Sequence, residues 1–179
     1  MENNLVEIRY RDEVHRVESG IRIDDFLRGI NGGVADTVLS ALVNRRQVML
    51  DFPLRGTVDL ELVQFGDREG ESVYKRSVSL MFYEACRELF PRARTVIGQS
   101  LGNCAHSQLR GEPPELAELA AALEVRMVDS HREARPFNRV TVTIEEAEKY
   151  FGEQGSEDKL WLLATRRSST VHPINCGTF

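Results

Sequence analysis

The sequence lacks several features that would assign a protein to a well-known class. Its 179 residues contain no G-x-x-x-x-G-K-[S/T] phosphate-binding loop, which argues against phosphoryl transfer by this segment. No apolar run approaches the roughly 20 residues that cross a bilayer, so no membrane role is expected. The three cysteines have no paired spacing and residues 1–4 have no signal-peptide character, so a reducing cytoplasm is the expected location.

An excess of basic residues is also missing. The formal net charge is -5, and 28% of the residues are charged against 41% that are hydrophobic, which is typical of a globular protein. An acidic chain has no general electrostatic attraction for a phosphate backbone. Any nucleic-acid binding therefore needs a local basic site.

Close groups of metal ligands are scarce as well. The four histidines are scattered, and Cys104 and His106 form the one close pair of ligand types. On a strand, a spacing of two places both side chains on one face, within reach of one ion or as a nucleophile and its base. The alternative, a half-buried cysteine beside a surface histidine, stays open, and no metal site is predicted beyond this candidate pair.

What is present in residues 1–66 is a pattern of short strands around one helix. Alternating apolar residues predict a hairpin from residues 5–10 and 14–17, with a turn at Arg11-Asp12. Apolar spacings of three and four predict a helix over residues 21–30, which Gly32-Gly33 ends. A second hairpin from residues 38–43 and 47–50, and a last strand over 57–65, complete this part.

The rest of the chain is organised around residues 72–110. Apolar spacing predicts a helix over residues 72–90, with Ser72 as its cap and Pro91 as its end. A strand over 93–97, a turn over 98–103 and a strand over 104–109 follow. The polar, glycine-containing residues 65–72 predict a linker between two domains.

Past residue 110 the pattern alternates between helices and strands. After a helix-entry loop at residues 111–114, the spacing predicts a helix to about Ser130, then strands over 139–142 and 171–175. Thr143 and Glu146 form a capping box that starts a helix running to about Phe151, which Gly152 closes. A further helix over 158–164 is expected to pack Leu160, Trp161 and Leu163.

Residues 98–102 read Gly-Gln-Ser-Leu-Gly, which formally fits the G-x-S-x-G pattern of a hydrolase nucleophile elbow. An elbow needs a strand before the serine and a helix after it. Here a strand is predicted on both sides, so the pattern favours a turn between strands over a catalytic serine.

A short pattern extends over residues 6–70, and its characteristic positions are 17–20, Asp25, 43–44, Leu54, 56–58 and 65–70. Through these positions the segment resembles the TGS domain, a small ubiquitin-like β-grasp module of threonyl-tRNA synthetases, some GTPases and stringent-response enzymes. The resemblance implies an α+β chain that begins with a TGS domain over residues 4–66.

A second pattern begins with residues 76–81 and continues to residues 97–98. It resembles the opening of the editing-type second domain of threonyl-tRNA synthetase, an α/β domain that would cover residues 70–179. In that family the first helix carries an H-x-x-x-H pair in the site that hydrolyses mischarged tRNA, and here Arg76 and Leu80 stand in those positions. The family's remaining Cys and His ligands would lie beyond residue 179, which implies a domain truncated at its C-terminus. The matching residues are 76–81, Ala85, 89–91, Ala93 and 97–98.

Residues 74–79 and 97–103 are also similar to the same region at the front of a bacterial nucleoside (uridine) kinase family. That resemblance implies a non-catalytic recognition or regulatory region with no catalytic residue and no cofactor of its own. ATP and Mg²⁺ are then expected only in a downstream P-loop kinase domain, its partner in the parent chain. The alternative is an aminoacyl-tRNA deacylase related to threonyl-tRNA synthetase.

The candidate ligand site follows from the same segment. Arg76 replaces a neutral base or metal ligand by a permanent cation, which suits an anion or a ribose-phosphate; the alternative, an arginine salt-bridged on an exposed face, stays open. We expect the helix and the glycine-flanked turn to form one cleft for a nucleotide, a tRNA end or a small phosphate ligand. Its candidate contacts are Arg76, Ser77, Gly98, Gln99, Ser100, Gly102 and His106.

Overall fold

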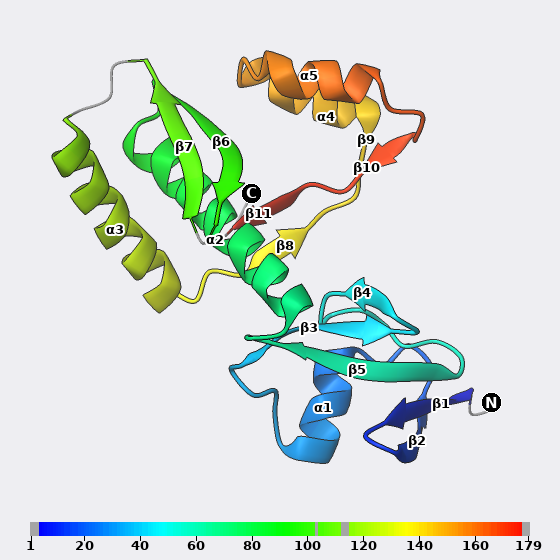
Figure 1. The fold of residues 1–179 in the computed structure, drawn as a ribbon. Helices are drawn as coiled ribbons and strands as arrows, with labels where there is room; N and C mark the ends of the chain where they lie inside the picture. The colour runs from blue at the N-terminus through cyan, green and yellow to red at the C-terminus, as the bar shows by residue number, and fades with distance from the viewer. Residues whose placement is uncertain (1–3, 103, 112–114, 177–179) are drawn as a thin grey trace. The chain divides into compact units, whose positions relative to one another are not determined.

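The computed structural model describes residues 4–102, 104–111 and 115–176. The chain is a mixed α+β protein that divides into two compact units, Met1–Val78 and Ser79–Phe179. The boundary falls within helix α2 (Arg68–Leu89), which contributes residues to both units (Figure 1). Within the described residues, no helix is both long and apolar enough to cross a membrane.

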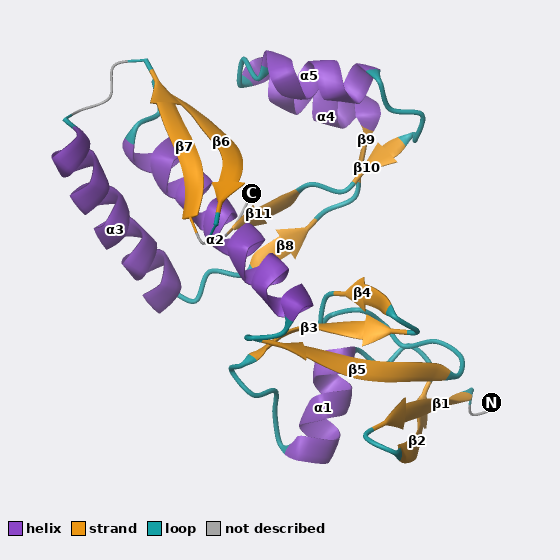
Figure 2. Cartoon of the chain, in the orientation of Figure 1, coloured by secondary structure: helices purple, strands orange, loops and turns teal. Residues whose placement is uncertain are grey.

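The first unit contains a five-stranded sheet with the strand order β2-β1-β5-β3-β4. The central strands β1 and β5 run parallel, and the other neighbours run antiparallel. Helix α1 (Ile23–Asn31) lies against one face of this sheet (Figure 2). The strands are β1 (Leu5–Tyr10), β2 (Glu13–Glu18), β3 (Val38–Val43), β4 (Arg46–Val48) and β5 (Val58–Gln64).

The core of the first unit lies between the sheet and α1. Ile8 and Tyr10 alternate along β1 with less buried residues, and both side chains are buried. Ile23, Phe26 and Leu27 share one face of α1 because their spacings are three and four, and they are buried in the same cluster. Each such side chain contributes about 1.5–3 kcal/mol by leaving water. The predicted first hairpin and first helix are confirmed.

Both hairpins of the first unit close through two-residue turns with left-handed backbone. Arg11 and Asp12 have φ values of 51° and 64°, and Asn44 and Arg45 have 50° and 66°. Such turns match the right-handed twist of the paired strands. Asn44 also accepts a hydrogen bond from the Asp59 amide through its side chain (2.9 Å), which fixes the second turn against β5.

The polar stretch 65–72 is not a linker, because α2 begins at Arg68, shortly after β5. The Asp67 carboxylate accepts from the Gln64 amide at 2.7 Å, and the Asp67 amide donates back to the Gln64 carbonyl at 3.1 Å. Because α2 begins at Arg68, Ser72 lies inside the helix and does not cap it. Its hydroxyl donates to the Arg68 carbonyl. Gly70 is buried against the Gln64 carbonyl, where only a residue without a side chain fits.

The second unit is built from short two-stranded ladders and helices. Strand pairs β6–β7, β8–β11 and β9–β10 are all antiparallel. The strands predicted over 139–142 and 171–175 are each divided into two, and the halves pair in different ladders. The elements are β6 (Arg94–Leu101), β7 (Cys104–Arg110), α3 (Leu116–Arg132), β8 (Phe137–Arg139), β9 (Val142–Thr143), α4 (Ile144–Glu153), α5 (Glu157–Ala164), β10 (Thr170–Val171) and β11 (Ile174–Cys176).

An apolar cluster and an ion-pair network join α2 to α3. Cys86 is fully buried and packs in one cluster with Leu119 and Leu123 of α3. Nearby, Glu88 of α2 accepts hydrogen bonds from Arg126 of α3 and from Arg135, the latter at 2.6 Å. The hydrogen bond from Arg126 lowers the pKa of Glu88; burial opposes this shift, and the contact with Arg135 adds to it.

The C-terminal helices confirm one local prediction and correct another two. Thr143 and Glu146 form the predicted capping box, with both reciprocal hydrogen bonds present. The helix does not end at Gly152 but continues to Glu153. The prediction that Trp161 packs inward is wrong, since 79% of it is exposed, whereas Leu163 is buried with Ala147 of α4.

Candidate functional site

The predicted turn over residues 98–103 is wrong, because β6 continues to Leu101. Ile97 pairs with Ser107 and Ser100 pairs with Ala105, so β6 contains one residue more than β7 between these pairs. Gly98 and Gln99 therefore lie in a β-bulge and not at a tip. The turn itself includes Gly102, whose φ is 61°, while Asn103 lies outside the described residues.

Ser100 is engaged in holding the hairpin together. Its hydroxyl contacts the carbonyl oxygens of Gly102 at 3.2 Å and of Cys104 at 3.4 Å. Because the residues on both sides are strands, the local structure is not a nucleophile elbow. Ser100 in this arrangement stabilises the end of the hairpin.

Cys104 and His106 lie two apart on β7, the spacing expected to put them on one face. Both are exposed, so the alternative of a half-buried cysteine is wrong. The His106 ring lies close to Gly98: a Cβ built on Gly98 would be 3.2 Å from Nδ1 of His106. In the described parts of the chain, no three His, Cys, Asp or Glu residues are placed to hold a metal ion. The pair remains two exposed side chains on one face.

Arg76 and Ser77 belong to the first unit, whereas the other candidate contacts belong to the second. Arg76 is exposed, and its guanidinium donates from Nε to the Ser72 carbonyl at 3.0 Å and from Nη2 to Gln47 at 3.5 Å. Ser77 is half-buried. A single cleft lined by all seven residues stays a prediction.

Within the second unit the described residues form a different site, which we call the basic groove. It consists of two adjoining hollows of about 440 and 370 Å³ that share Tyr83, Arg87, Gln154 and Lys159 as lining residues. Leu80, which stands in the second family histidine position, lines one of them. The groove is made mainly by α2, β6, the end of α4 and the start of α5.

Positive charge gathers in this groove although the chain as a whole is acidic. Four cationic side chains line it against two carboxylates, a local excess of two positive charges, whereas the net charge of the chain is -5. A concave basic site raises the local concentration of anions. The cations are Arg87, Arg92, Arg94 and Lys159, and the carboxylates are Glu84 and Asp158.

The cations differ in how they are held. Arg94 pairs with Asp158 at 3.2 Å, and both side chains are largely exposed. Partial burial acts to lower the pKa of Arg87, but a hydrogen bond with Tyr150 and the charge of Glu84 outweigh it and raise the pKa. Arg92 makes no ion pair with any described residue. Its charge is therefore available to an incoming anion.

Aromatic side chains line the same groove. Tyr83, Tyr150 and Phe151 contribute to its wall, and the rings of Tyr150 and Phe151 meet edge to face at 5.2 Å. Cations beside aromatic rings are the combination that holds unpaired nucleotides, since phosphates need charge and bases stack on rings. The groove is thus chemically suited to a short single-stranded nucleic-acid segment.

Sequence reasoning missed this groove. Arg87, Arg92 and Arg94 are three arginines within eight residues around Pro91, a signal that the sequence contained. Lys159 gave no such signal, because only the fold brings α5 beside α2. The glycine-flanked segment 98–103 gave the stronger sequence signal, although most of it forms part of a strand.

Sequence comparison finds similarity between this chain and threonine–tRNA ligases. No protein-family model matches the chain. It is 29% identical over 173 residues to a threonine–tRNA ligase of Desulforamulus reducens, a match that covers 96% of this chain and 27% of the ligase. It is 26% identical over 168 residues to that of Clostridioides difficile (93% and 26%) and 25% identical over 177 residues to that of Parabacteroides distasonis (98% and 27%).

The chain is homologous, at modest identity, to the N-terminal region of threonyl-tRNA synthetases. It spans about a quarter of the length of these relatives. The homology covers both units, since the matched residues make up nearly the whole chain. The three relatives named above are ligases, and they give no support to the predicted kinase family.

Proposed function

We propose that this chain is a tRNA synthetase-related module whose second unit recognises the 3′ end of a tRNA in the basic groove. The observation that carries the proposal is the groove itself: an excess of cations beside three aromatic rings, in an acidic chain. Homology to threonine–tRNA ligases makes a tRNA the nucleic acid to test first.

The single-stranded 3′ end of a tRNA presents phosphates and unpaired bases, which are the groups that this groove suits. Stacking of a base on an aromatic ring contributes about 1–3 kcal/mol. Each phosphate neutralised by Arg87, Arg92 or Lys159 adds a salt-dependent contribution. Two or three such contacts suffice for weak, salt-sensitive binding.

Recognition is favoured over hydrolysis by the residues in the two family histidine positions. Arg76 is a permanent cation and cannot act as a general base at neutral pH. Leu80 has no donor, acceptor or metal ligand, and it lines the groove as an apolar contact. The competing deacylase function would depend on Cys104 and His106, the close pair of reactive side chains on β7.

Fluorescence anisotropy with a labelled acceptor minihelix tests the proposal. Arg87→Ala and Arg92→Ala should each weaken binding about tenfold, the effect of losing a charge-assisted hydrogen bond. Arg132→Ala is the matched control, since Arg132 is an exposed arginine of the same unit, 74% accessible, that lies on α3. A blunt duplex without the 3′ overhang should bind more weakly; equal affinity for both RNAs would sink the proposal.

A deacylation assay separates the two functions. With seryl-tRNA or threonyl-tRNA as substrate, the chain should protect the ester or leave its half-life unchanged. Hydrolysis that Cys104→Ala or His106→Ala removes would replace recognition by editing as the function of this chain.

Two finer proposals concern the first unit and the parent protein. The parallel central pair β1–β5 with α1 packed on the sheet supports a β-grasp TGS assignment for the first unit. The sequence resemblance to a nucleoside kinase family, together with Arg76 and Leu80 in place of histidines, supports a regulatory region of such a kinase. The reading frame after Phe179 tests the latter: a phosphate-binding loop there, with its ATP and Mg²⁺, would support it.

A further inference from the structure

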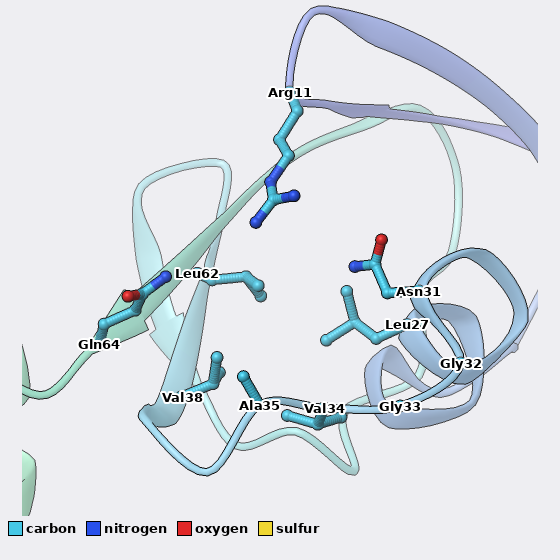
Figure 3. A pocket seen from close by; sticks show the side chains of 10 residues that line it. All are labelled: Arg11, Leu27, Asn31, Gly32, Gly33, Val34, Ala35, Val38, Leu62 and Gln64. Atoms are coloured by element: carbon cyan, nitrogen blue, oxygen red, sulfur yellow. The ribbon is translucent and has the colours of Figure 1, made fainter.

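The first unit contains a hollow of about 420 Å³ that the proposed function does not use. It opens beside the β1–β2 turn, the end of α1 and strand β5 (Figure 3). Its lining combines three polar side chains with an apolar wall. The polar side chains are Arg11, Asn31 and Gln64, and the apolar ones are Leu27, Val34, Ala35, Val38 and Leu62.

The polar and apolar groups are segregated in this hollow. Figure 3 shows the Arg11 side chain extending from the hairpin turn towards the hollow, with Gln64 and Asn31 on either side. Leu27 and Leu62 lie between the arginine and the segment around Val34. A ligand in this space would meet a guanidinium and amides at one end and aliphatic side chains at the other.

Arg11 differs from the arginines that flank it along the hairpin. Arg9 pairs with Asp59 at 3.3 Å and Arg16 pairs with Glu7 at 3.2 Å. No carboxylate of the described residues pairs with Arg11, whose guanidinium carbon lies 5.1 Å from the centre of the Tyr10 ring. Its guanidinium is therefore available to an anion, and a guanidinium binds a carboxylate in a two-point fork.

The C-terminal end of α1 borders the hollow, so its last carbonyl groups bear on this anion. Gly32, with a φ of 72°, closes the helix by donating its amide to the Arg28 carbonyl at 3.1 Å. This hydrogen bond satisfies one of the carbonyl groups that give the helix end its partial negative charge. The amide groups of Asn31 and Gln64 supply both donors and acceptors beside the guanidinium.

We infer that the first unit binds a small carboxylate with an apolar body, its carboxylate on Arg11 and its apolar part against Leu27 and Leu62. The volume lies in the range of small-molecule sites, about 300–1,000 Å³. The inference goes beyond the proposed function, because it concerns another unit, another ligand chemistry and none of the groove residues. Failure of either proposal leaves the other unaffected.

Methyl-resolved NMR titration of the full 179-residue chain tests the inference. The probe is N-acetyl-leucine, and its neutral amide, N-acetyl-leucinamide, is the matched ligand of the same shape. The carboxylate should shift the methyl signals of Leu27, Val34 and Leu62, and the amide should bind about tenfold more weakly because it lacks the charge. Inorganic phosphate, which lacks an apolar part, should leave the methyl signals of Leu27, Val34 and Leu62 unmoved.

Substitutions in the two hairpin turns provide a second test of the inference. Arg11→Gln should weaken N-acetyl-leucine about tenfold or more, since glutamine keeps a polar side chain but not the cation. Arg45→Gln is the control, because Arg45 also lies in a left-handed hairpin turn and does not line the hollow. The inference fails if tens of millimolar N-acetyl-leucine shift no methyl signal of a residue that lines the hollow. It also fails if the acid and its amide bind equally, or if the Arg11→Gln and Arg45→Gln variants bind the acid with equal affinity.

Discussion

Lys159 of α5 donates a hydrogen bond from Nζ to the hydroxyl of Tyr83 on α2, at 3.2 Å. The same ammonium lies 4.9 Å from the centre of the Tyr83 ring and 4.8 Å from that of Phe151. The lysine is thus held by aromatic groups and not by a carboxylate of the described residues. It joins α5 to α2 while its positive charge remains uncompensated in the basic groove.

Replacement of this lysine should affect both stability and binding. Lys159→Met removes two cation–π contacts and a hydrogen bond, so we expect a loss of about 1 kcal/mol in the free energy of unfolding. Affinity for the acceptor minihelix should also fall several-fold. Lys149→Met, at an exposed position on α4, is the control for both urea denaturation and anisotropy, and a matching loss in that variant would contradict the assigned role.

Removal of a groove carboxylate should strengthen binding. Asp158 pairs with Arg94, and both side chains are 57% exposed, so the pair contributes at most about 1 kcal/mol to stability. Asp158→Asn frees Arg94 for a phosphate and should raise minihelix affinity up to about fivefold, with a steeper dependence on salt. Glu157→Gln makes the same charge change one residue away, outside the groove lining, and should alter affinity less.

The network around Glu88 should make stability depend on acid pH. Contacts with Arg126 and Arg135 lower the pKa of Glu88 in the folded chain. Glu88 therefore contributes its full stabilisation at pH values above its pKa in the unfolded chain. The contribution is lost as the pH falls through the lower folded pKa. Glu88→Gln should cost about 1 kcal/mol at neutral pH and reduce the acid-induced loss, which urea denaturation at several pH values measures.

An exposed glutamate of α3 supplies the reference for that experiment. Glu124→Gln should change stability little at any pH, because Glu124 is exposed and makes no ion pair with a described residue. If both variants show the same pH dependence, the acid sensitivity arises elsewhere in the chain.

Two helical glycines should respond in opposite directions to alanine. A Cβ on Gly70 would lie 1.9 Å from the Gln64 carbonyl oxygen, so Gly70→Ala must displace α2 from β5 and should cost about 1–3 kcal/mol or more. A Cβ on Gly29 meets nothing within 4 Å, so Gly29→Ala should stabilise α1 by up to about 1 kcal/mol. Thermal unfolding of both variants measures the difference, and destabilisation by Gly29→Ala would contradict the open space around it.

The cysteines of α2 and β7 should differ in reactivity. Burial raises the pKa of the Cys86 thiol, and its side chain is inaccessible, whereas Cys104 is exposed. Iodoacetamide at neutral pH should label Cys104 within minutes and Cys86 only after denaturation. Peptide mapping by mass spectrometry distinguishes the two, and early labelling of Cys86 would show that α2 and α3 separate readily.

Local sequence signals predict local structure well in this chain. The capping box of Thr143 and Glu146 and the two-residue turn at Arg11-Asp12 involve neighbours in the chain, so their geometry follows from nearby residues alone. The predicted start of α2 is wrong because Gly70 suggests a loop until the carbonyl of Gln64 is known to lie against it. Gly70 is needed for this tertiary contact and does not mark a flexible segment.

The candidate site is harder to predict for the same reason. The groove depends on Lys159 reaching Tyr83, a contact across 76 positions of the chain. Trp161 lies in a helix that is apolar on most sides, and only the position of α4 decides which side is covered. Arg76 is a candidate through a resemblance, yet its hydrogen bonds are with neighbours in the first unit.

The additional residue in β6 changes which side chains share a face of the hairpin. Strict two-residue alternation would group Ile97 with Leu101. Because Ile97 pairs with Ser107 and Leu101 pairs with Cys104, the bulge places these two residues on opposite faces. Ile97 is therefore free to line the basic groove, while Leu101, 57% exposed, is directed to the same side as Cys104 and His106. One inserted position thus gives the hairpin an apolar residue for each of its two surfaces.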